Sequence, residues 1–259
     1  MFKKNNAFLN FKKSTIATLV LGAFISSAYA ETYKLRIGAG HPVQGIAHVT
    51  AVQDFFMPEV NKRLEKLGHK VEWTAAWGGS IAKLPETLEA TKSGLLDVGV
   101  VNIPFHSATL FTNNFPFYFP FQPSDHVLAV KAVRATYAEV PWLYEVFEKK
   151  YNQKHLGVGQ NGDYGIGARF EIKKFEDLKG NKVGAAGPNL NWFRNTGVVG
   201  VQSNLNEGYN AMQTGVYQGF VIFPGPYYGF KLHEVGKYFL DAGLGAPAAI
   251  ALTINLDTW

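Results

Sequence analysis

Cysteine is absent from this sequence of 259 residues. Disulfides and thiolate metal sites are therefore excluded, and the fold must be stabilised by its hydrophobic core alone. The seven histidines show no HxH or HExxH spacing, and the one close pair, His41 and His48, falls in a loop and at a helix start. We interpret this pair as non-ligands and expect neither a metal nor any other cofactor.

Catalytic motifs are lacking as well. The sequence contains no GxSxG, no cysteine nucleophile and no glycine-rich phosphate loop. The adjacent carboxylates Glu176 and Asp177 fall in a turn, where their side chains point in different directions and give no acid–base geometry. An exported hydrolase is the rival class that these absences disfavour, and we predict that the chain is not an enzyme.

No apolar run is long enough to span a membrane. The stretch at residues 16–25 follows four lysines and precedes the small residues Ala28-Tyr29-Ala30. It is shorter than the roughly 20 residues of a membrane-spanning helix and is typical of a secretory signal peptide. We predict a signal peptide at residues 1–30, cleaved after Ala30, and a mature chain in the periplasm of a Gram-negative bacterium that is not anchored in the membrane.

The excess of positive charge belongs to the same segment. The whole chain has a formal net charge of +5 and a pI of about 9.2. The first 30 residues carry four lysines and no acidic residue, so the mature chain keeps 21 of the 25 basic side chains against 20 acidic ones. A nearly neutral mature chain gives no reason to expect a nucleic-acid or anionic-membrane partner.

Strand and helix patterns alternate in the first half of the mature chain. They predict strands at 33–38, 71–75 and 98–101 and helices at 48–67 and 84–93. This order favours a mostly parallel sheet covered by helices, with ligands bound beyond the carboxyl ends of the strands. The candidate lining residues are then His41, Gln44, Trp77 and Asn102. Core packing is an equal alternative for Trp77, and an ordinary turn is the alternative for Asn102.

A second series of elements follows. The patterns predict a helix at 127–151 broken by Pro141, a strand at 182–185 and a helix at 205–214, capped by Asn204 and ended by Gly215. Pro188 suits the first position of another helix, whose first turn would hold Asn189 and Trp192. The free N–H groups of such a turn can receive an anion.

Several ordered blocks carry a family resemblance. They include GGSIAKLPETLEATKSGLLDVGVV at 78–101, GARFEIKKFEDLKGNKVG at 167–184, AAGPNLNWF at 185–193 and NEGYNAMQTGVYQG at 206–219. In order and spacing, the chain from about residue 33 to the C-terminus closely resembles the solute receptors of TRAP transporters.

The resemblance implies a two-lobed α/β periplasmic binding protein fold with mostly parallel sheets and a ligand cleft between interleaved lobes, which are joined by crossing strands and a long helix. We place lobe I at residues 31–165 and 248–259, and lobe II at 166–247. Relatives usually continue past the equivalent of Trp259, so we expect lobe I to lack C-terminal helices.

The resemblance also implies partners. The receptor would close over a small organic acid and deliver it to the membrane subunits of a TRAP transporter. We expect it to act as a monomer. In an alternative class, the same receptor would be the ligand-sensing subunit of a membrane signalling system.

Arg169 is the first candidate for the ligand anchor. A guanidinium matches a carboxylate bidentately, and in this family an arginine in the block before the charged turn commonly has that role. The alternative is a surface salt bridge to Asp163 or Glu171. The chain departs from the family at Gly184, where relatives usually carry the main carboxylate-binding arginine, and at 220–224, where FVIFP replaces a polar Gln-Glu-Asn run.

These departures favour a ligand with few polar groups, because a desolvated hydroxyl or second carboxylate would find no partner. We predict a monocarboxylate with an apolar or aromatic body, held by Arg169 and by the turn at Asn189. A C4-dicarboxylate or sugar acid is the alternative ligand, and packing is the alternative role for several of the rings. The remaining candidate binding residues are Phe105, Phe170, Trp192, Tyr209, Phe223 and Tyr227.

Overall fold

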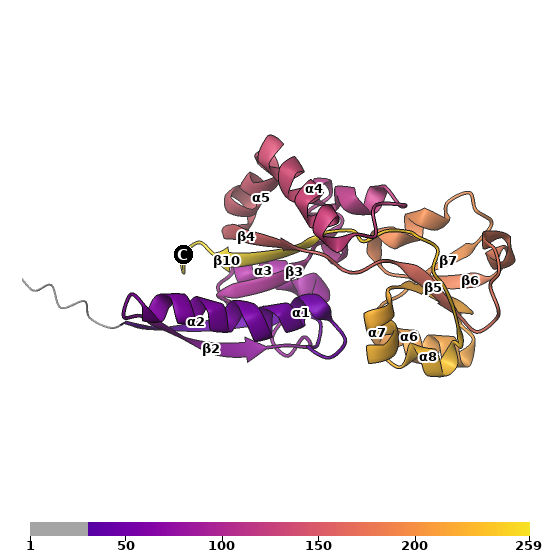
Figure 1. The fold of residues 1–259 in the computed structure, drawn as a ribbon, viewed down its shortest axis with the longest axis horizontal. Coiled ribbons are helices and arrows are strands. Elements are labelled where there is room, and N and C mark those ends of the chain that lie inside the picture. The colour runs from indigo at the N-terminus through magenta and orange to yellow at the C-terminus, as the bar shows by residue number, and fades with distance from the viewer. Residues whose placement is uncertain (1–30) are drawn as a thin grey trace, which may run out of the picture.

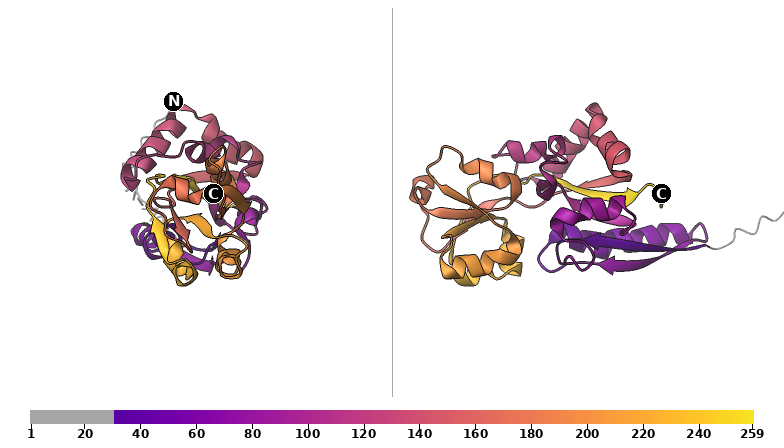
Figure 2. Two further views of the ribbon diagram at one scale, coloured as in Figure 1. Left: turned by 90° about the vertical axis from the view of Figure 1, so that its right-hand side faces the viewer. Right: turned by 180° about the vertical axis from the view of Figure 1, so that it is seen from behind.

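The computed structural model describes residues 31–259, so the predicted signal peptide lies outside the described residues. Two lobes lie side by side, each built on a five-stranded sheet with flanking helices (Figures 1 and 2). The predicted two-lobed α/β architecture is confirmed.

The sheet of lobe I combines early, middle and late segments of the chain. Its strands, in spatial order, are β2 (Lys70–Ala76), β1 (Thr32–Ala39), β3 (Val98–Asn102), β10 (Ile250–Asn255) and β4 (Gln153–Gly159). β1 pairs in parallel with β2 and β3, whereas β10 pairs antiparallel with β3 and β4.

The sheet of lobe II has the same plan. Its strands, in spatial order, are β7 (Val199–Gln202), β6 (Lys182–Ala185), β8 (Gly219–Ile222), β5 (Gly165–Ala168) and β9 (Tyr238–Leu240). β6 is parallel to β7 and β8, whereas β5 is antiparallel to β8 and β9. Both sheets are therefore mixed rather than mostly parallel, because the strands that flank the crossings between lobes pair antiparallel.

Two segments cross between the lobes. Residues 160–164 lead from β4 to β5, and residues 241–249 lead from β9 back to β10 (Figure 1). The lobes are therefore interleaved in sequence. The long connecting helix that the resemblance implied is not among the elements of residues 31–259, whose longest helix, α4, has 14 residues.

Helices of lobe I follow the predicted pattern. They are α1 (Ala47–Ala51), the π-helical η1 (Val52–Phe56), α2 (Met57–Glu65), η2 (Leu84–Glu86), α3 (Thr87–Lys92), η3 (Ile103–His106), η4 (Thr112–Tyr118), α4 (His126–Glu139) and α5 (Trp142–Tyr151). Pro141 separates α4 from α5, as expected, because proline lacks the N–H that would continue the helix. Within residues 31–259, no helix is both long and apolar enough to cross a membrane.

The longest helix of lobe II has 10 residues. The helices of this lobe are η5 (Phe175–Leu178), η6 (Gly187–Phe193), α6 (Leu205–Thr214), α7 (Pro224–Gly229) and α8 (Leu232–Val235). The predicted ends of α6 are confirmed: the Asn204 side chain accepts from the N–H groups of Asn206 and Glu207, and Gly215 closes the helix at φ 79°. η6 begins near Pro188 as predicted, but it is a 3₁₀ helix rather than an α-helix.

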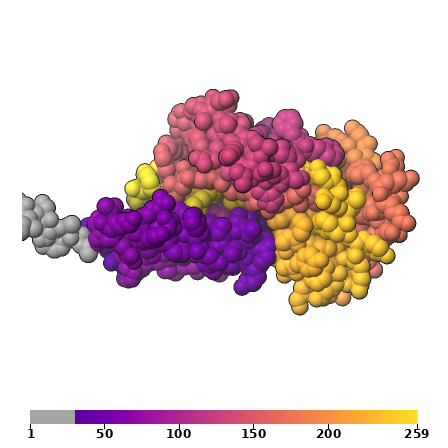
Figure 3. Space-filling model, viewed as in Figure 1, coloured from indigo at the N-terminus to yellow at the C-terminus, as the bar shows by residue number. Residues whose placement is uncertain are grey.

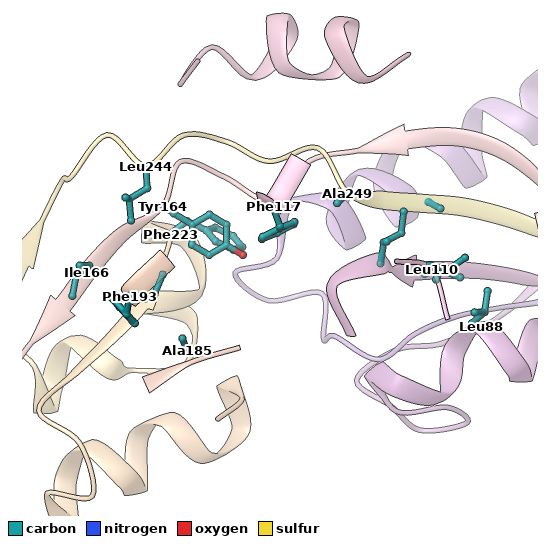
Figure 4. Close-up of a cluster of buried hydrophobic side chains, with 14 of the residues drawn as sticks. Leu88, Leu110, Phe117, Tyr164, Ile166, Ala185, Phe193, Phe223, Leu244 and Ala249 are labelled. Atoms are coloured by element: carbon teal, nitrogen blue, oxygen red, sulfur yellow. The ribbon is translucent and has the colours of Figure 1, made fainter. Parts of the chain in front are cut away.

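The hydrophobic core continues from one lobe into the other. One cluster of buried side chains includes Phe117 of lobe I, Tyr164 of the first crossing and Phe223 of lobe II. Figure 4 shows these three rings between the two lobes, with Leu110 on one side and Phe193 on the other. Ring centroids lie 5.9 Å apart for Phe117 and Tyr164, and 5.1 Å apart for Tyr164 and Phe223. Aromatic packing therefore connects the two lobes through the first crossing.

A groove of about 410 Å³ lies on one face of lobe I. Figure 3 shows it between the indigo helical stretch of α1 and α2 and the magenta helices. Its lining is mainly apolar and comes from the α1–η1 stretch, α4, β3, β4 and β10, and it includes Phe55, which is 69% exposed. This groove lies on the sheet of lobe I.

Candidate functional site

A small enclosed cavity of about 30 Å³ lies between the lobes. Residues of lobe I, the first crossing and lobe II form its walls: His41, Asn102, Pro104, Phe105, Asn161, Tyr164, Ala186, Asn189, Leu205 and Phe220 to Phe223. Most of them lie at, or shortly after, the carboxyl ends of β1, β3, β6 and β8. This is the place where open α/β sheets bind ligands.

Four polar side chains in the cavity wall are almost completely buried. His41 is 5% exposed, Asn102 3%, Asn161 4% and Asn189 2%. Each has a side-chain atom without a protein partner, namely His41 Nε2, Asn102 Oδ1, Asn161 Nδ2 and Asn189 Nδ2. Buried polar atoms are normally hydrogen-bonded, so these four unpaired atoms make the cavity the candidate binding site.

Asn102 and His41 are coupled to each other. The Asn102 amide nitrogen lies 3.4 Å from His41 Nδ1. With the amide in this orientation its nitrogen donates, so Nδ1 accepts and the proton of the neutral ring lies on Nε2. Burial lowers the pKa of His41 to about 4. His41 is therefore a neutral ring in the cavity wall at pH 7.

His48 lies behind His41 in the wall of lobe I. The two rings are 5.5 Å apart and packed edge to face. Burial, and secondarily the charge of His41, lower the pKa of His48 to about 3. Both rings are therefore uncharged at neutral pH. Among the described residues, no group of three or more histidine, aspartate or glutamate side chains could hold a metal ion.

Aromatic rings and aliphatic side chains form the rest of the wall. Phe105 packs edge to face on His41 at 6.1 Å, and Tyr164 packs in the same way on Phe223. Gly184 stands where the resemblance implied an arginine, and two rings pack against it: a methyl group there would lie 2.6 Å from Phe220 Cδ2 and 2.8 Å from Tyr217 Cζ. The aromatic residues thus take the space that a side chain at 184 would need.

Arg169 does not reach this cavity. β5 begins beside the cavity, where Gly165 pairs with Ile222. The strand then runs away from the cavity and ends where Ala168 pairs with Gly219. Arg169 follows at the far end of the sheet, where its Nη1 donates to the Met212 carbonyl oxygen at 3.0 Å. The structure therefore does not bring Arg169 together with the other candidates. The alternative ion pair to Asp163 or Glu171 is not formed among the described residues either.

Five other predicted residues do meet at the cavity: His41, Asn102, Phe105, Asn189 and Phe223. Trp192 lies beside it, where its ring is 5.4 Å from Tyr164 and its Nε1 donates to the Phe117 carbonyl oxygen.

The remaining candidates lie elsewhere. Trp77 Nε1 donates to Gln53 Oε1 at 2.8 Å, and Gln44 is exposed. Tyr209 donates to Glu234, and Tyr227 donates to the Gly236 carbonyl oxygen beneath β5. Phe170 packs against the core cluster.

Sequence reasoning missed several wall residues. Asn161 and Tyr164 belong to the first crossing, Leu205 begins α6, and Ile222 ends β8. An available signal was the Asn-Gly-Asp-Tyr stretch at 161–164, a polar turn between two predicted series of elements. No local pattern distinguishes Leu205 from an ordinary core residue.

Two open grooves adjoin the enclosed cavity. One, of about 490 Å³, is lined by residues that include Ser107, Tyr118 and Asn191. The other, of about 540 Å³, is lined by residues that include Lys83 and Glu207. Phe105 lines the cavity and both grooves, so its ring stands between the enclosed space and the open ones.

Solved structures with the same fold come from TRAP periplasmic solute-binding proteins. The protein from Desulfovibrio salexigens superposes with a TM-score of 0.70 at 19% identity, over 88% of this chain and 67% of that one. The protein from Pseudomonas putida F1, with bound D-glucuronate, gives 0.70 at 21% identity, over 87% and 72%. A Bordetella pertussis extracytoplasmic solute receptor that binds pyroglutamic acid gives 0.69 at 21% identity, over 86% and 71%.

Sequence comparisons agree with the fold. An uncharacterized protein of Haemophilus influenzae is 25% identical over 261 residues, which cover 95% of this chain and 72% of that protein. The model of the family described as bacterial extracellular solute-binding protein, family 7, matches residues 50–259. The resemblance to TRAP receptors is thereby confirmed, and the chain belongs to family 7 of the bacterial extracellular solute-binding proteins.

Proposed function

We propose that this chain is the periplasmic receptor of a TRAP transporter, and that its interlobe cavity binds a small organic acid with one carboxyl group and an apolar or aromatic body. The observation that carries the proposal is the set of unpaired, buried polar atoms contributed by both lobes and by the first crossing. Two proteins of the same fold hold acids with one carboxyl group, D-glucuronate and pyroglutamic acid, which supports an organic acid as the ligand; the apolar or aromatic body is inferred from the cavity wall alone.

The cavity is too small to admit a ligand without movement of the lobes. Small-molecule sites usually measure about 300–1,000 Å³, whereas this cavity measures about 30 Å³. The ligand therefore enters when the lobes are farther apart, through bending of the crossings at 160–164 and 241–249. By contacting Asn102 of lobe I and Asn189 of lobe II, it stabilises the closed form, which the membrane subunits then recognise.

The chemistry of the wall selects the body of the ligand. Phe105, Tyr164 and Phe223 offer aromatic surface. Ile222 belongs to the apolar stretch that replaces the polar run usual in the family. A sugar acid would bring several hydroxyl groups to this surface, and each hydroxyl without a partner would cost about 1–3 kcal/mol. A dicarboxylate would bring a second charge without a countercharge.

A thermal-shift screen of residues 31–259 tests the proposal. The panel contains aromatic monocarboxylates, aliphatic monocarboxylates, C4-dicarboxylates and sugar acids. We expect stabilisation by aromatic monocarboxylates, of about 2.7 kcal/mol when the free ligand is at a hundredfold excess over Kd. A clear preference for a C4-dicarboxylate or a sugar acid would contradict the ligand class, and turnover of any acid would contradict the receptor function.

Two variants connect the screen to the site. Asn189→Ala removes a buried amide of the cavity wall and should abolish most of the ligand-induced shift. Arg169→Ala is the matched control, because Arg169 lies at the opposite end of β5. This variant should retain the full ligand-induced shift. Loss of the shift in Arg169→Ala would show that the acid binds elsewhere.

A further inference from the structure

The unpaired atoms of the cavity form an unequal set of donors and acceptors. Three are donors, namely His41 Nε2, Asn161 Nδ2 and Asn189 Nδ2, and one is an acceptor, Asn102 Oδ1. If the Asn102 amide were rotated by 180°, Oδ1 would accept from His41 Nδ1, and the acceptor facing the cavity would be His41 Nε2. In both orientations this coupled pair places one donor and one acceptor in the wall.

The cavity wall carries no formal charge. None of its residues is a lysine, arginine, aspartate or glutamate. The titratable groups in contact with it are His41 and Tyr164, with His48 behind His41, and burial raises the pKa of Tyr164. The neighbouring Asp163 carboxylate accepts from the Gly245 N–H. Lys83 and Glu207 line the groove that adjoins the cavity at Phe105.

We propose that the cavity binds its ligand in an uncharged form, through a group that both donates and accepts hydrogen bonds, such as a protonated carboxyl, a carboxamide or a lactam. This inference rests on the proposed function and specifies the form in which the ligand is held. The donor of the ligand pairs with the acceptor of the Asn102–His41 pair, and its oxygen accepts from Asn161 and Asn189.

An ionised carboxylate fits the same wall less well for two physical reasons. It only accepts hydrogen bonds, so it leaves Asn102 Oδ1 unpaired or facing a negatively charged oxygen. It also brings a charge into a closed site that has no countercharge, which is costly without a paired cation. A carboxamide of the same shape meets neither obstacle.

Calorimetric titration of matched ligand pairs tests the inference. The probes are benzoate with benzamide, and pyroglutamate with pyroglutamamide, each titrated into residues 31–259 at pH 5.5, 6.5 and 7.5. We expect the Kd of each amide to be unchanged over this range. The Kd of each acid should rise about tenfold per pH unit, because the protonated fraction of the free acid falls tenfold. His41 stays neutral in this window, since its pKa is about 4.

The outcomes separate this inference from the proposed function. Acids that bind with a Kd independent of pH, while their amides bind more than tenfold more weakly, would overturn the uncharged form and leave the receptor function intact. If neither ligand pair binds and no acid of the thermal-shift panel stabilises the protein, both proposals are wrong. Lys83→Met serves as a control: it should leave the four Kd values unchanged, and loss of acid binding in this variant would mean that a lysine countercharge holds the carboxylate.

Discussion

At the scale of single residues, buried histidines set the response to pH. Burial lowers the pKa of His41 and His106 to about 4 and that of His48 to about 3. In the unfolded chain these groups take up a proton near pH 6.5. As the pH falls below 6.5, the unfolded state therefore binds more protons than the folded state, and the free energy of unfolding decreases until the pH reaches the folded pKa values.

We accordingly expect the stability to be nearly constant above pH 7 and to fall between pH 6.5 and about 4. Each of these histidines contributes a slope of up to about 1.4 kcal/mol per pH unit. His48→Leu should reduce the slope by one such contribution, as measured by urea unfolding at pH 7.5, 6.0 and 5.0. His126→Leu, at an exposed position, is the control. An unchanged slope in His48→Leu would contradict the assignment of a neutral, buried ring.

Individual site residues were predictable where strand ends define them. Asn102 was expected at the cavity because it follows a buried strand, and Asn189 because Pro188 places it in the first turn of a helix. Phe105 was expected there only as an aromatic ring against the body of the ligand. Arg169 was expected there because of its charge and its family context. The structure places it at the opposite end of β5, because the direction of that strand is not visible in its four-residue pattern.

At the scale of elements, glycines allow the lobes to meet. Gly45, in the loop after β1, faces Gly225 and Gly229 of α7. A methyl group at Gly225 would lie 2.9 Å from the Gly45 carbonyl oxygen, and one at Gly45 would lie 3.0 Å from Gly229 Cα. Backbone atoms cannot move aside as a flexible side chain can, so this contact depends on the absence of side chains.

Substituting one of these glycines should hold the lobes apart. We expect Gly225→Ala to increase the radius of gyration measured by small-angle X-ray scattering and to weaken ligand binding, because the closed form loses its backbone contact. Gly157→Ala in β4 is the control, since a methyl group there meets no atom within 4 Å. If Gly225→Ala bound ligand as tightly as Gly157→Ala, contact between these elements would not govern closure.

Element boundaries were predictable to different degrees. The ends of α6 follow from Asn204 and Gly215, because capping and the left-handed conformation are local properties of those residues. The 3₁₀ form of η6 was not predictable from Pro188. The side chains of η6 make tertiary contacts: Asn189 lies in the cavity wall, and Trp192 donates a hydrogen bond to the Phe117 carbonyl oxygen.

At the scale of the whole molecule, Trp192 links the two lobes. Its Nε1 donates to the Phe117 carbonyl oxygen at 2.7 Å, and its ring is stacked on Phe117 at 6.0 Å with an interplanar angle of 17°. Stacked aromatic pairs contribute about 0.5–1.5 kcal/mol beyond the area they bury. This contact therefore favours the arrangement in which the lobes touch.

Removing the link should shift the population toward separated lobes. We expect Trp192→Ala to give a larger radius of gyration in the ligand-free protein than the unsubstituted chain. Trp192→Phe keeps an aromatic ring but loses the N–H donor, so its radius should be intermediate. Equal radii for all three proteins would show that this contact does not control the arrangement of the lobes.

The sequence by itself determined the class of fold, the order of most elements, the caps of α6 and the family, because period, capping residues and block order are local or linear properties of the chain. Only the tertiary structure decided that both sheets are mixed, that Asn161 and Tyr164 complete the cavity and that Arg169 stays outside it. The direction of each strand after a crossing decides which of its ends reaches the cleft, and that direction depends on pairing between segments far apart in the chain.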